Sequence, residues 1–222
     1  MRKGDNPLAD APQKSLSDLG LQAQGGENPN VTGLAVDSRH VRQGYLLAAL
    51  PGSKFHGAEF VSYALRQGAG AVLTDAAGAA MAADALKQYP ASLVVTEDPR
   101  GALAAASALW FGAQPATMVA VTGTNGKTSV ASFVRQLWIA LGYPAVNLGT
   151  TGIEGAWSAP LAHTTPEPIT LHGALADAVR HGITHASMEA SSHGLDQRRL
   201  DGVLLSAAGF SNFTQDHLDY HG

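Results

Sequence analysis

The sequence has no cysteine, little charge and no long hydrophobic run, and each absence excludes a class of protein. Without cysteine there is no disulfide, no zinc–thiolate site and no thiol nucleophile. Charged residues make up only 14% of the chain and its net charge is −4, so nucleic-acid binding is disfavoured. No apolar run approaches the roughly 18 residues of a membrane helix, and the polar N-terminus lacks the apolar core of a signal peptide. These absences favour a cytoplasmic protein that binds neither membrane nor nucleic acid.

The hydrophobic content of 45% is sufficient for one large domain or two modest ones in 222 residues. Residues 1–30 are expected to form a partly disordered lead-in. Beyond them, short apolar runs alternate with helical patterns, which predicts a small α/β domain over residues 31–114. The expected strands are 46–50, 69–75 and 93–98, the expected helices are 60–68 and 101–112, and A-Q-P-A at 113–116 is a plausible linker.

A second α/β domain is expected over residues 117–222. Its first strand, 117–123, is apolar and rich in β-branched residues, as in the buried strands of parallel sheets. After a glycine-rich turn, apolar residues recur at helical spacing over 128–141. Further strands are expected at 184–190 and 204–212. The sequence stops at Gly222 without a capping element, so we expect this domain to be incomplete.

The turn G-T-N-G-K-T lies between the predicted strand and helix, which is the context that a phosphate-binding loop requires. Its two glycines allow a tight turn and a close approach of the backbone to an anion. The amides after Gly123 and the start of the helix would donate to the phosphates of ATP, and Lys127 would reach the β and γ phosphates. The hydroxyl of Thr128 would bind Mg²⁺. An ordinary strand-to-helix turn is the alternative. The residues expected to contact ATP are Gly123, Thr124, Asn125, Gly126, Lys127, Thr128 and Ser129.

Two further residues are candidates for magnesium binding. Glu189 ends the strand 184–190, at the edge where parallel sheets place their ligands, so its carboxylate is suited to hold Mg²⁺. A solvated acid at a strand end is the alternative. His217 follows the last strand between Asp216 and Asp219, but spacing alone leaves its role undecided. Seven of the nine histidines follow position 160, so several must be bystanders.

Several motifs occur together in this chain: D-S-R (37–39), G-x-x-x-x-G (52–57), G-T-N-G-K-T (123–128), T-T-P-E (164–167), M-E-A-S-S-H-G-L (188–195) and N-F-T-Q-D-H-L-D-Y-H-G (212–222). In this order they resemble the Mur ligases of peptidoglycan synthesis, and among these the members that add the third amino acid. The stretch S-S-H-G-L-x-Q-x-R is the most discriminating, because sister ligases carry different residues there. The resemblance covers nearly the whole chain after residue 30.

The resemblance implies a UDP-binding domain followed by a P-loop-type, parallel-sheet ATP-binding domain. It also implies an ATP- and Mg²⁺-dependent carboxylate–amine ligase of cell wall biogenesis, acting in the cytoplasm as a monomer and needed for cell shape and division. In such ligases ATP phosphorylates the terminal carboxylate of UDP-N-acetylmuramoyl-L-alanyl-D-glutamate. The amine of a diamino acid, diaminopimelate or lysine, then attacks the acyl phosphate. This family and the folylpolyglutamate synthetases use the shorter loop, whereas a generic P-loop kinase needs glycine where this chain has Val121.

The resemblance also implies roles for individual residues. Contacts with the uridine and its diphosphate are implied for Val36, Ser38, Ser53, Lys54 and Phe55. Contacts with the muramoyl peptide are implied for Thr164, Thr165, Ser191, Gln197 and Arg199. Glu189 and His217 would bind magnesium with Thr128, and Lys127, Glu189 and His217 would be catalytic. Simpler readings remain: Ser38 as a turn cap, Lys54 and Arg199 as surface charges, and Thr164 and Thr165 as loop residues before Pro166.

Two parts of the family pattern are absent from these 222 residues. One is a carbamate-modified lysine that helps bind magnesium shortly after D-Y-H-G, and the other is the C-terminal domain that recognises the incoming amino acid. We therefore expect the chain by itself to be catalytically inactive. The alternatives are another Mur ligase, a folylpolyglutamate synthetase, against which the N-terminal motifs and S-S-H-G-L argue, and a non-catalytic module that binds a nucleotide or UDP-muramoyl peptide.

Overall fold

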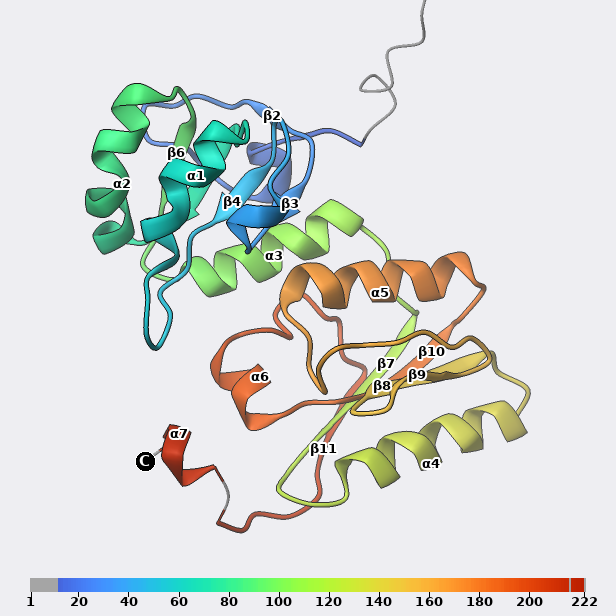
Figure 1. Cartoon of the computed structure of the whole chain (residues 1–222). Helices are drawn as coiled ribbons and strands as arrows, with labels where there is room; N and C mark the ends of the chain where they lie inside the picture. The colour runs from blue at the N-terminus through green and yellow to red at the C-terminus, as the bar shows by residue number, and fades with distance from the viewer. Residues whose placement is uncertain (1–11, 216, 222) are drawn as a thin grey trace, which may run out of the picture. The chain divides into compact units, whose positions relative to one another are not determined.

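The computed structural model describes residues 12–215 and 217–221, without the side chains of Asp219 and His221. The chain divides into two compact units, of which the first ends at Trp110 and the second begins at Phe111. Each unit has a mainly parallel sheet packed with helices, so the predicted α/β fold class is confirmed (Figure 1).

The first unit has a four-stranded parallel sheet of order β3-β4-β5-β6. Its strands are β3 (Leu34–Ala35), β4 (Leu46–Ala48), β5 (Ala71–Thr74) and β6 (Ser92–Val95), and its helices are α1 (Val61–Arg66), α2 (Ala76–Gln88) and α3 (Pro99–Phe111). Short 3₁₀ helices also occur, η2 at Ser38–His40 and η3 at Gly57–Phe60. The three predicted strands and two predicted helices of this region are confirmed. The sequence did not predict α2, because its alanine-rich stretch has little apolar contrast between its faces.

The first unit begins earlier than the sequence indicated. Strand β1 (Lys14–Ser15) pairs antiparallel with β2 (Asn30–Val31), and the 3₁₀ helix η1 (Ser17–Leu19) lies between them. Leu16 and Leu19 are fully buried. The predicted start at residue 31 is therefore too late, because these leucines sit in elements too short to show a periodicity. Of the predicted lead-in, residues 1–11 lie outside the described part of the chain.

The second unit has a five-stranded sheet of order β11-β7-β10-β8-β9. The strands are β7 (Thr117–Thr122), β8 (Ala145–Gly149), β9 (Gly152–Gly155), β10 (His185–Glu189) and β11 (Ala207–Phe210). All neighbours pair in parallel except β9, which is antiparallel to β8. The predicted strands at 117–123, 184–190 and 204–212 are confirmed as β7, β10 and β11.

The helices of the second unit are α4 (Lys127–Ala140), α5 (Pro168–Arg180), α6 (Ser192–Asp196) and α7 (Leu218–His221). The predicted helix 128–141 is confirmed as α4. Figure 1 shows α4 and α5 on opposite faces of the sheet. Leu171 and Leu175 of α5 are buried against the core residues Met118, Val146 and Met188 of the strands. Because β7, β8, β10 and β11 pair in parallel, their carboxyl ends meet at one edge of the sheet, where Lys127 and Glu189 follow or end their strands.

No helix in residues 12–215 and 217–221 combines the length and the apolar character that crossing a membrane demands.

Candidate functional site

The glycine-rich turn between β7 and α4 contains two glycines in the left-handed region. Gly123 has φ of 124° and Gly126, the N-cap of α4, has φ of 84°. A Cβ on Gly123 would collide with Ser211 Oγ and lie 2.8 Å from the carbonyl oxygen of Asn212. A Cβ on Gly126 would meet nothing within 4 Å. Gly123 is therefore required for close packing, whereas Gly126 supplies the turn and leaves the approach to the helix open.

The segment after β11, residues 211–214, holds the turn in place. The carbonyl oxygen of Asn212 accepts from the Thr124 N–H (3.1 Å), and its side-chain Oδ1 accepts from the Asn125 N–H (3.1 Å). Its Nδ2 donates to the carbonyl oxygen of Asn125 (2.9 Å). These two N–H groups are therefore occupied by protein, so of the amides after Gly123 that were expected to donate to phosphates, those of Thr124 and Asn125 are not free in this structure.

Two hydroxyl residues of the same segment complete the attachment. Ser211 Oγ donates to the carbonyl oxygen of Asn125 (2.7 Å), and Thr214 and Thr124 exchange two hydrogen bonds of 3.0 Å. Within the described residues, the N–H groups of Gly126, Lys127, Thr128 and Ser129 have no hydrogen-bond partner, and the first helical bond is donated by Val130 to the carbonyl oxygen of Gly126 (2.9 Å). The donors that remain for an anion therefore lie at the start of the helix, where its dipole also favours negative charge.

Lys127 is half-buried at the start of α4 and turns back over the loop. Its Nζ donates to the carbonyl oxygens of Gly123 (2.5 Å) and Thr124 (3.0 Å). An ammonium has three donors and two are used here, so a ligand can take the third or displace the carbonyls. Ser129 lies exposed in the same helical turn.

Glu189 is buried, with 2% of its surface exposed, at the end of β10. Thr128 Oγ1 donates to one carboxylate oxygen (2.9 Å), and the Thr150 N–H donates to the other (2.9 Å). A Cβ on Gly149 would collide with the Glu189 carboxylate. The last residue of β8 must therefore be glycine to leave room for this side chain. The reading of Glu189 as a solvated acid is therefore wrong.

No lysine, arginine or histidine of the described residues forms an ion pair with Glu189. A buried carboxylate held only by neutral donors carries a large desolvation cost, and a bound cation would reduce it. Since carboxylate and hydroxyl oxygens are the ligands that Mg²⁺ prefers, the pair formed by Glu189 and Thr128 fits this ion.

His217 is exposed and lines the mouth of a pocket of about 280 Å³, together with Lys127, Phe213 and the turn 122–124. Its ring lies edge-on to that of His193, with centroids 4.7 Å apart. Its neighbour Asp216 lies outside the described residues. In residues 12–215 and 217–221 no three acidic or histidine side chains gather closely enough to hold a metal ion. A role for His217 as a magnesium ligand therefore stays a prediction.

The predicted peptide-binding residues form one hydrogen-bonded network with Glu189. Thr165 is 1% exposed; its Oγ1 donates to the carbonyl oxygen of Glu189 (3.0 Å) and accepts from the Ser191 N–H (3.0 Å). Arg199 donates to the carbonyl oxygen of Thr165 (2.7 Å) and to Gln197 Oε1 (2.7 Å). Thr165 does lie in the loop before Pro166, as the simpler reading had it, but its side chain is buried and hydrogen-bonded. Arg199 is half-buried and hydrogen-bonded, so the reading of it as a surface charge is wrong.

Two more contacts extend this network. The hydroxyls of Thr164 and Thr150 lie 2.9 Å apart, which connects Thr164 to the residue that donates to Glu189. Gln197 donates to the hydroxyl of Tyr220 (3.0 Å), and this hydroxyl donates to Asp196 (2.7 Å). The sequence did not indicate Tyr220 as a site residue, because this contact joins positions 23 and 24 residues apart.

In the first unit, three of the five predicted uridine-binding residues line one pocket of about 660 Å³: Val36, Ser38 and Phe55. The pocket also contains Arg39, Phe60 and Tyr63. The sequence missed these two aromatic residues, although their spacing of three places them on one side of a helical turn. Ser53 and Lys54 are exposed on the loop and are not among the lining residues.

Asp37 shapes one wall of this pocket. Its carboxylate caps η2 by accepting from the Arg39 N–H (2.9 Å) and pairs with the Arg39 guanidinium at 2.6 Å. The hydrogen bond from the Arg39 side chain lowers the pKa of Asp37 to about 2. The reading of Ser38 as the turn cap is therefore wrong, because Asp37 takes that position.

Two family profiles match the chain, the Mur ligase family, catalytic domain, over residues 30–110 and the Mur ligase middle domain over residues 121–222. UDP-N-acetylmuramoyl-L-alanyl-D-glutamate--2,6-diaminopimelate ligase of Brucella melitensis biotype 1 is 50% identical over 192 residues, which make up 86% of this chain and 38% of that protein. The ligase of the same name from Rhizobium meliloti is 46% identical over 216 residues, 96% of this chain and 43% of that protein. The chain thus spans about 40% of the length of these relatives.

Solved structures agree with these relatives. A structure of a ligase with the same name is 31% identical, with a TM-score of 0.77, and the match covers 95% of this chain and 42% of that one. MurF ligase from Thermotoga maritima in complex with ADP is 18% identical, with a TM-score of 0.51, over 81% of this chain and 37% of that one. At this lower identity the likeness shows the shared fold alone.

Proposed function

Because the chain belongs to the Mur ligase family, we propose that it forms the precursor-binding and nucleotide-binding part of a ligase that joins 2,6-diaminopimelate to UDP-N-acetylmuramoyl-L-alanyl-D-glutamate, using ATP. The observation that carries this proposal is the buried Glu189 carboxylate beside the phosphate loop. It has no cationic partner among the described residues and accepts from Thr128, the residue after Lys127.

The phosphates of ATP would lie at the start of α4. The free N–H groups of Gly126, Lys127 and Thr128 would donate to them, and the Lys127 ammonium would leave the loop carbonyls for a phosphate oxygen. The N–H groups are held by the loop and the helix before a ligand binds, and together with the relocated ammonium they would stabilise the charge that spreads over the transferring phosphoryl group.

Glu189 and Thr128 would hold Mg²⁺. His217, which lines the neighbouring pocket with Lys127, is a third candidate ligand. The ion would neutralise part of the phosphate charge when bound. Thr150 and Thr165 keep Glu189 in place, the first through its N–H and the second through the Glu189 carbonyl oxygen.

The first unit has a pocket for the uridine of the precursor. The aromatic and aliphatic walls of the first pocket suit the flat uracil ring, with Ser38 as a hydrogen-bonding group and Ser53 and Lys54 on the adjacent loop. The Arg199 guanidinium, oriented by Thr165 and Gln197, suits a carboxylate of the peptide. We place the reaction in the cytoplasm, because it would consume ATP and a UDP-linked precursor.

The relatives are more than twice as long as this chain. We therefore expect the 222 residues to bind both ligands without joining the amino acid to the peptide. Formation of the tripeptide product by the purified chain would contradict this expectation.

Calorimetric titration of the chain with Mg·ADP, and separately with the UDP-linked dipeptide, tests the proposal. We expect Lys127→Ala to weaken Mg·ADP binding at least about tenfold, since a buried charge-assisted contact is lost, and to leave precursor binding unchanged. Lys87→Ala, which removes an exposed lysine of α2, is the matched control. Absence of Mg·ADP binding in the wild-type chain, or equal affinities in wild type and Lys127→Ala, would overturn the assignment of the site.

A further inference from the structure

The loop between β4 and η3 is closed at its base in a way that explains its two glycines. Pro51 and His56 form an isolated antiparallel bridge, and the Gly52 N–H donates to the carbonyl oxygen of Phe55 (3.1 Å). A Cβ on Gly52 would lie 2.5 Å from that same oxygen, and a Cβ on Gly57 would lie 2.8 Å from a backbone nitrogen of the preceding strand segment. Both glycines are therefore needed for the chain to return on itself within so few residues.

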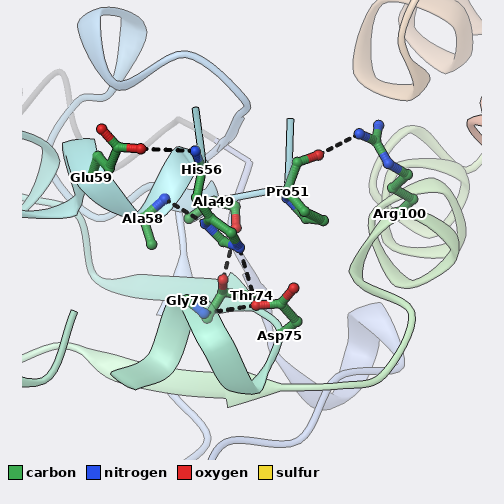
Figure 2. A network of polar contacts seen from close by, with 9 residues as sticks. All are labelled: Ala49, Pro51, His56, Ala58, Glu59, Thr74, Asp75, Gly78 and Arg100. Atoms are coloured by element: carbon green, nitrogen blue, oxygen red, sulfur yellow. Dashed lines mark hydrogen bonds and ion pairs between the residues drawn. The ribbon is translucent and has the colours of Figure 1, made fainter. Parts of the chain in front are cut away.

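His56 ties this loop to two elements of the first unit through three hydrogen bonds (Figure 2). Its backbone N–H donates to Glu59 Oε1 (3.0 Å), and its ring Nδ1 accepts from the Ala58 N–H (3.0 Å), which forms a capping box at η3. Its ring Nε2 lies 3.1 Å from Asp75 Oδ1, which also accepts from the Gly78 N–H (2.7 Å) at the start of α2. Because Nδ1 accepts from an amide, Nε2 carries the proton and donates to Asp75.

The His56 ring packs closely against Gly78 in the first turn of α2. A Cβ on Gly78 would lie 2.6 Å from the ring Cε1 and would collide with Thr74 Oγ1. Thr74 in turn donates to the carbonyl oxygen of Ala49 (2.7 Å), the residue that follows β4. The side chains of His56 and Asp75 are 15% and 25% exposed, so the contact between them is shielded from water.

A second tie fixes the other end of the loop. Arg100, at the start of α3, donates from Nη2 to the carbonyl oxygen of Pro51 (2.5 Å). Figure 2 shows this contact on the opposite side of the loop base from His56. The loop thus has an anchor on each strand of its base, whereas Phe55 near its tip is 64% exposed and forms a wall of the pocket.

We propose that His56, with Asp75 and Arg100, is a positioning residue that holds Phe55 in its place on the pocket wall before a ligand arrives. The proposal rests on the proposed function, because the ligand that benefits is the uridine nucleotide. A loop that is already ordered loses little conformational entropy on binding, so the anchors increase affinity without touching the ligand. A histidine ring is required because its two nitrogens contact two different elements. Nδ1 accepts from the Ala58 N–H at η3, and Nε2 donates to Asp75, which caps α2. No shorter side chain makes both contacts.

The test compares His56→Ala with His56→Gln, whose amide reaches the position of Nε2, in the full chain. We expect His56→Ala to raise the Kd for uridine diphosphate about 5- to 30-fold in calorimetry and to speed hydrogen exchange of the Gly52 and Gly57 amides at least about tenfold. His56→Gln should recover part of both effects, because its amide can still donate to Asp75. The control is Asp84→Ala, which removes an exposed carboxylate of α2, the helix that Asp75 caps.

Binding of Mg·ADP reports on folding of the second unit only and should stay unchanged in every variant, while hydrogen exchange in β4 and β5 reports on folding of the first unit. Uridine diphosphate binding that stays within twofold of wild type in His56→Ala would overturn the inference, and so would faster exchange throughout the first unit with no excess at the loop. If the wild-type chain fails to bind uridine diphosphate, the proposed function itself fails, which is a distinct result.

Discussion

The molecule has two loops that are bounded by glycines, and different kinds of contact hold each loop in place. Loop 52–57 of the first unit is closed on itself and tied to neighbouring helices by His56 and Arg100. Loop 123–126 of the second unit is held along its length by residues 211–214, about 90 positions later in the chain, and leads directly into the 14-residue helix α4.

The difference shows that glycine spacing alone does not specify what a loop recognises. The first loop leads into a short 3₁₀ helix and presents Phe55 to an apolar pocket, which suits a flat ring. The second leads into a long helix with free N–H groups, and Lys127 and Glu189 lie beside it, which suits phosphate and a cation. The element that follows the loop, and the charges brought to it, decide the chemistry.

The largest effect on stability is expected where loop 123–126 packs against residues 211–214. Gly123→Ala should destabilise the second unit by about 2–4 kcal/mol, because the new Cβ would meet Ser211 and Asn212 in a strained backbone. Gly126→Ala adds only backbone strain, about 1 kcal/mol, because its Cβ would meet nothing within 4 Å. Urea unfolding measures both values, and equal losses would mean that the contact with residues 211–214 contributes nothing.

An intermediate effect should follow from removing one residue of the support. Asn212→Ala eliminates two hydrogen bonds to Asn125 but retains the backbone contact to Thr124, so the loop should loosen without unfolding. We expect Mg·ADP binding to weaken about 5- to 10-fold, the equivalent of one net hydrogen bond. Uridine diphosphate binding in the first unit should not change. A parallel loss at both sites would break the comparison, because it would mean that the loops are not independent.

The smallest effect on stability is expected from Asp37, which lines the pocket of the first unit. Arg39 lowers the pKa of Asp37 to about 2 from its ordinary value of 3.8. A depressed folded-state pKa stabilises the protein above the unfolded-state pKa, so this contribution is present above about pH 4 and disappears as the pH falls towards 2. Its size is small because the Arg39 side chain is 78% exposed and screened by solvent.

Titration of the Asp37 carboxyl by NMR checks this expectation. In Arg39→Ala the pKa should rise towards 3.8, and stability below pH 4 should become less dependent on pH. An unchanged pKa in that variant would show that the hydrogen bond from the Arg39 side chain is not the cause.

The elements that the sequence predicted well are those whose pattern is local. Strand β7, its glycine turn and helix α4 were readable because an apolar run, two glycines and a helical repeat follow one another directly. Strand β9 was missed because two of its four residues are glycine, and β8 was missed although it is as long as β10. Helix α5 was missed too, although Glu167 caps it and Pro168 occupies its first turn.

The site was predictable only where residues follow strand ends. Glu189 and Lys127 could be placed at one edge of the sheet because parallel strands bring their ends together. The burial of Glu189, the capping role of Asp37 and the attachment of the loop to Asn212 depend on side chains from other elements. No local pattern carries that information, and for residues 211–214 the partner is about 90 positions away.

The long separation between loop 123–126 and its support has a consequence for how the protein is made. A ribosome adds roughly 5–20 residues per second, so residues 211–214 emerge roughly 5 to 20 seconds after the loop that they hold. Strand β11, which leads into this segment, pairs with β7 and joins the sheet in the same late step. During that interval the first unit, whose loop is anchored within its own first 100 residues, is already complete. The pocket of the first unit therefore matures early in synthesis, and loop 123–126 acquires its final shape only when β11 is added.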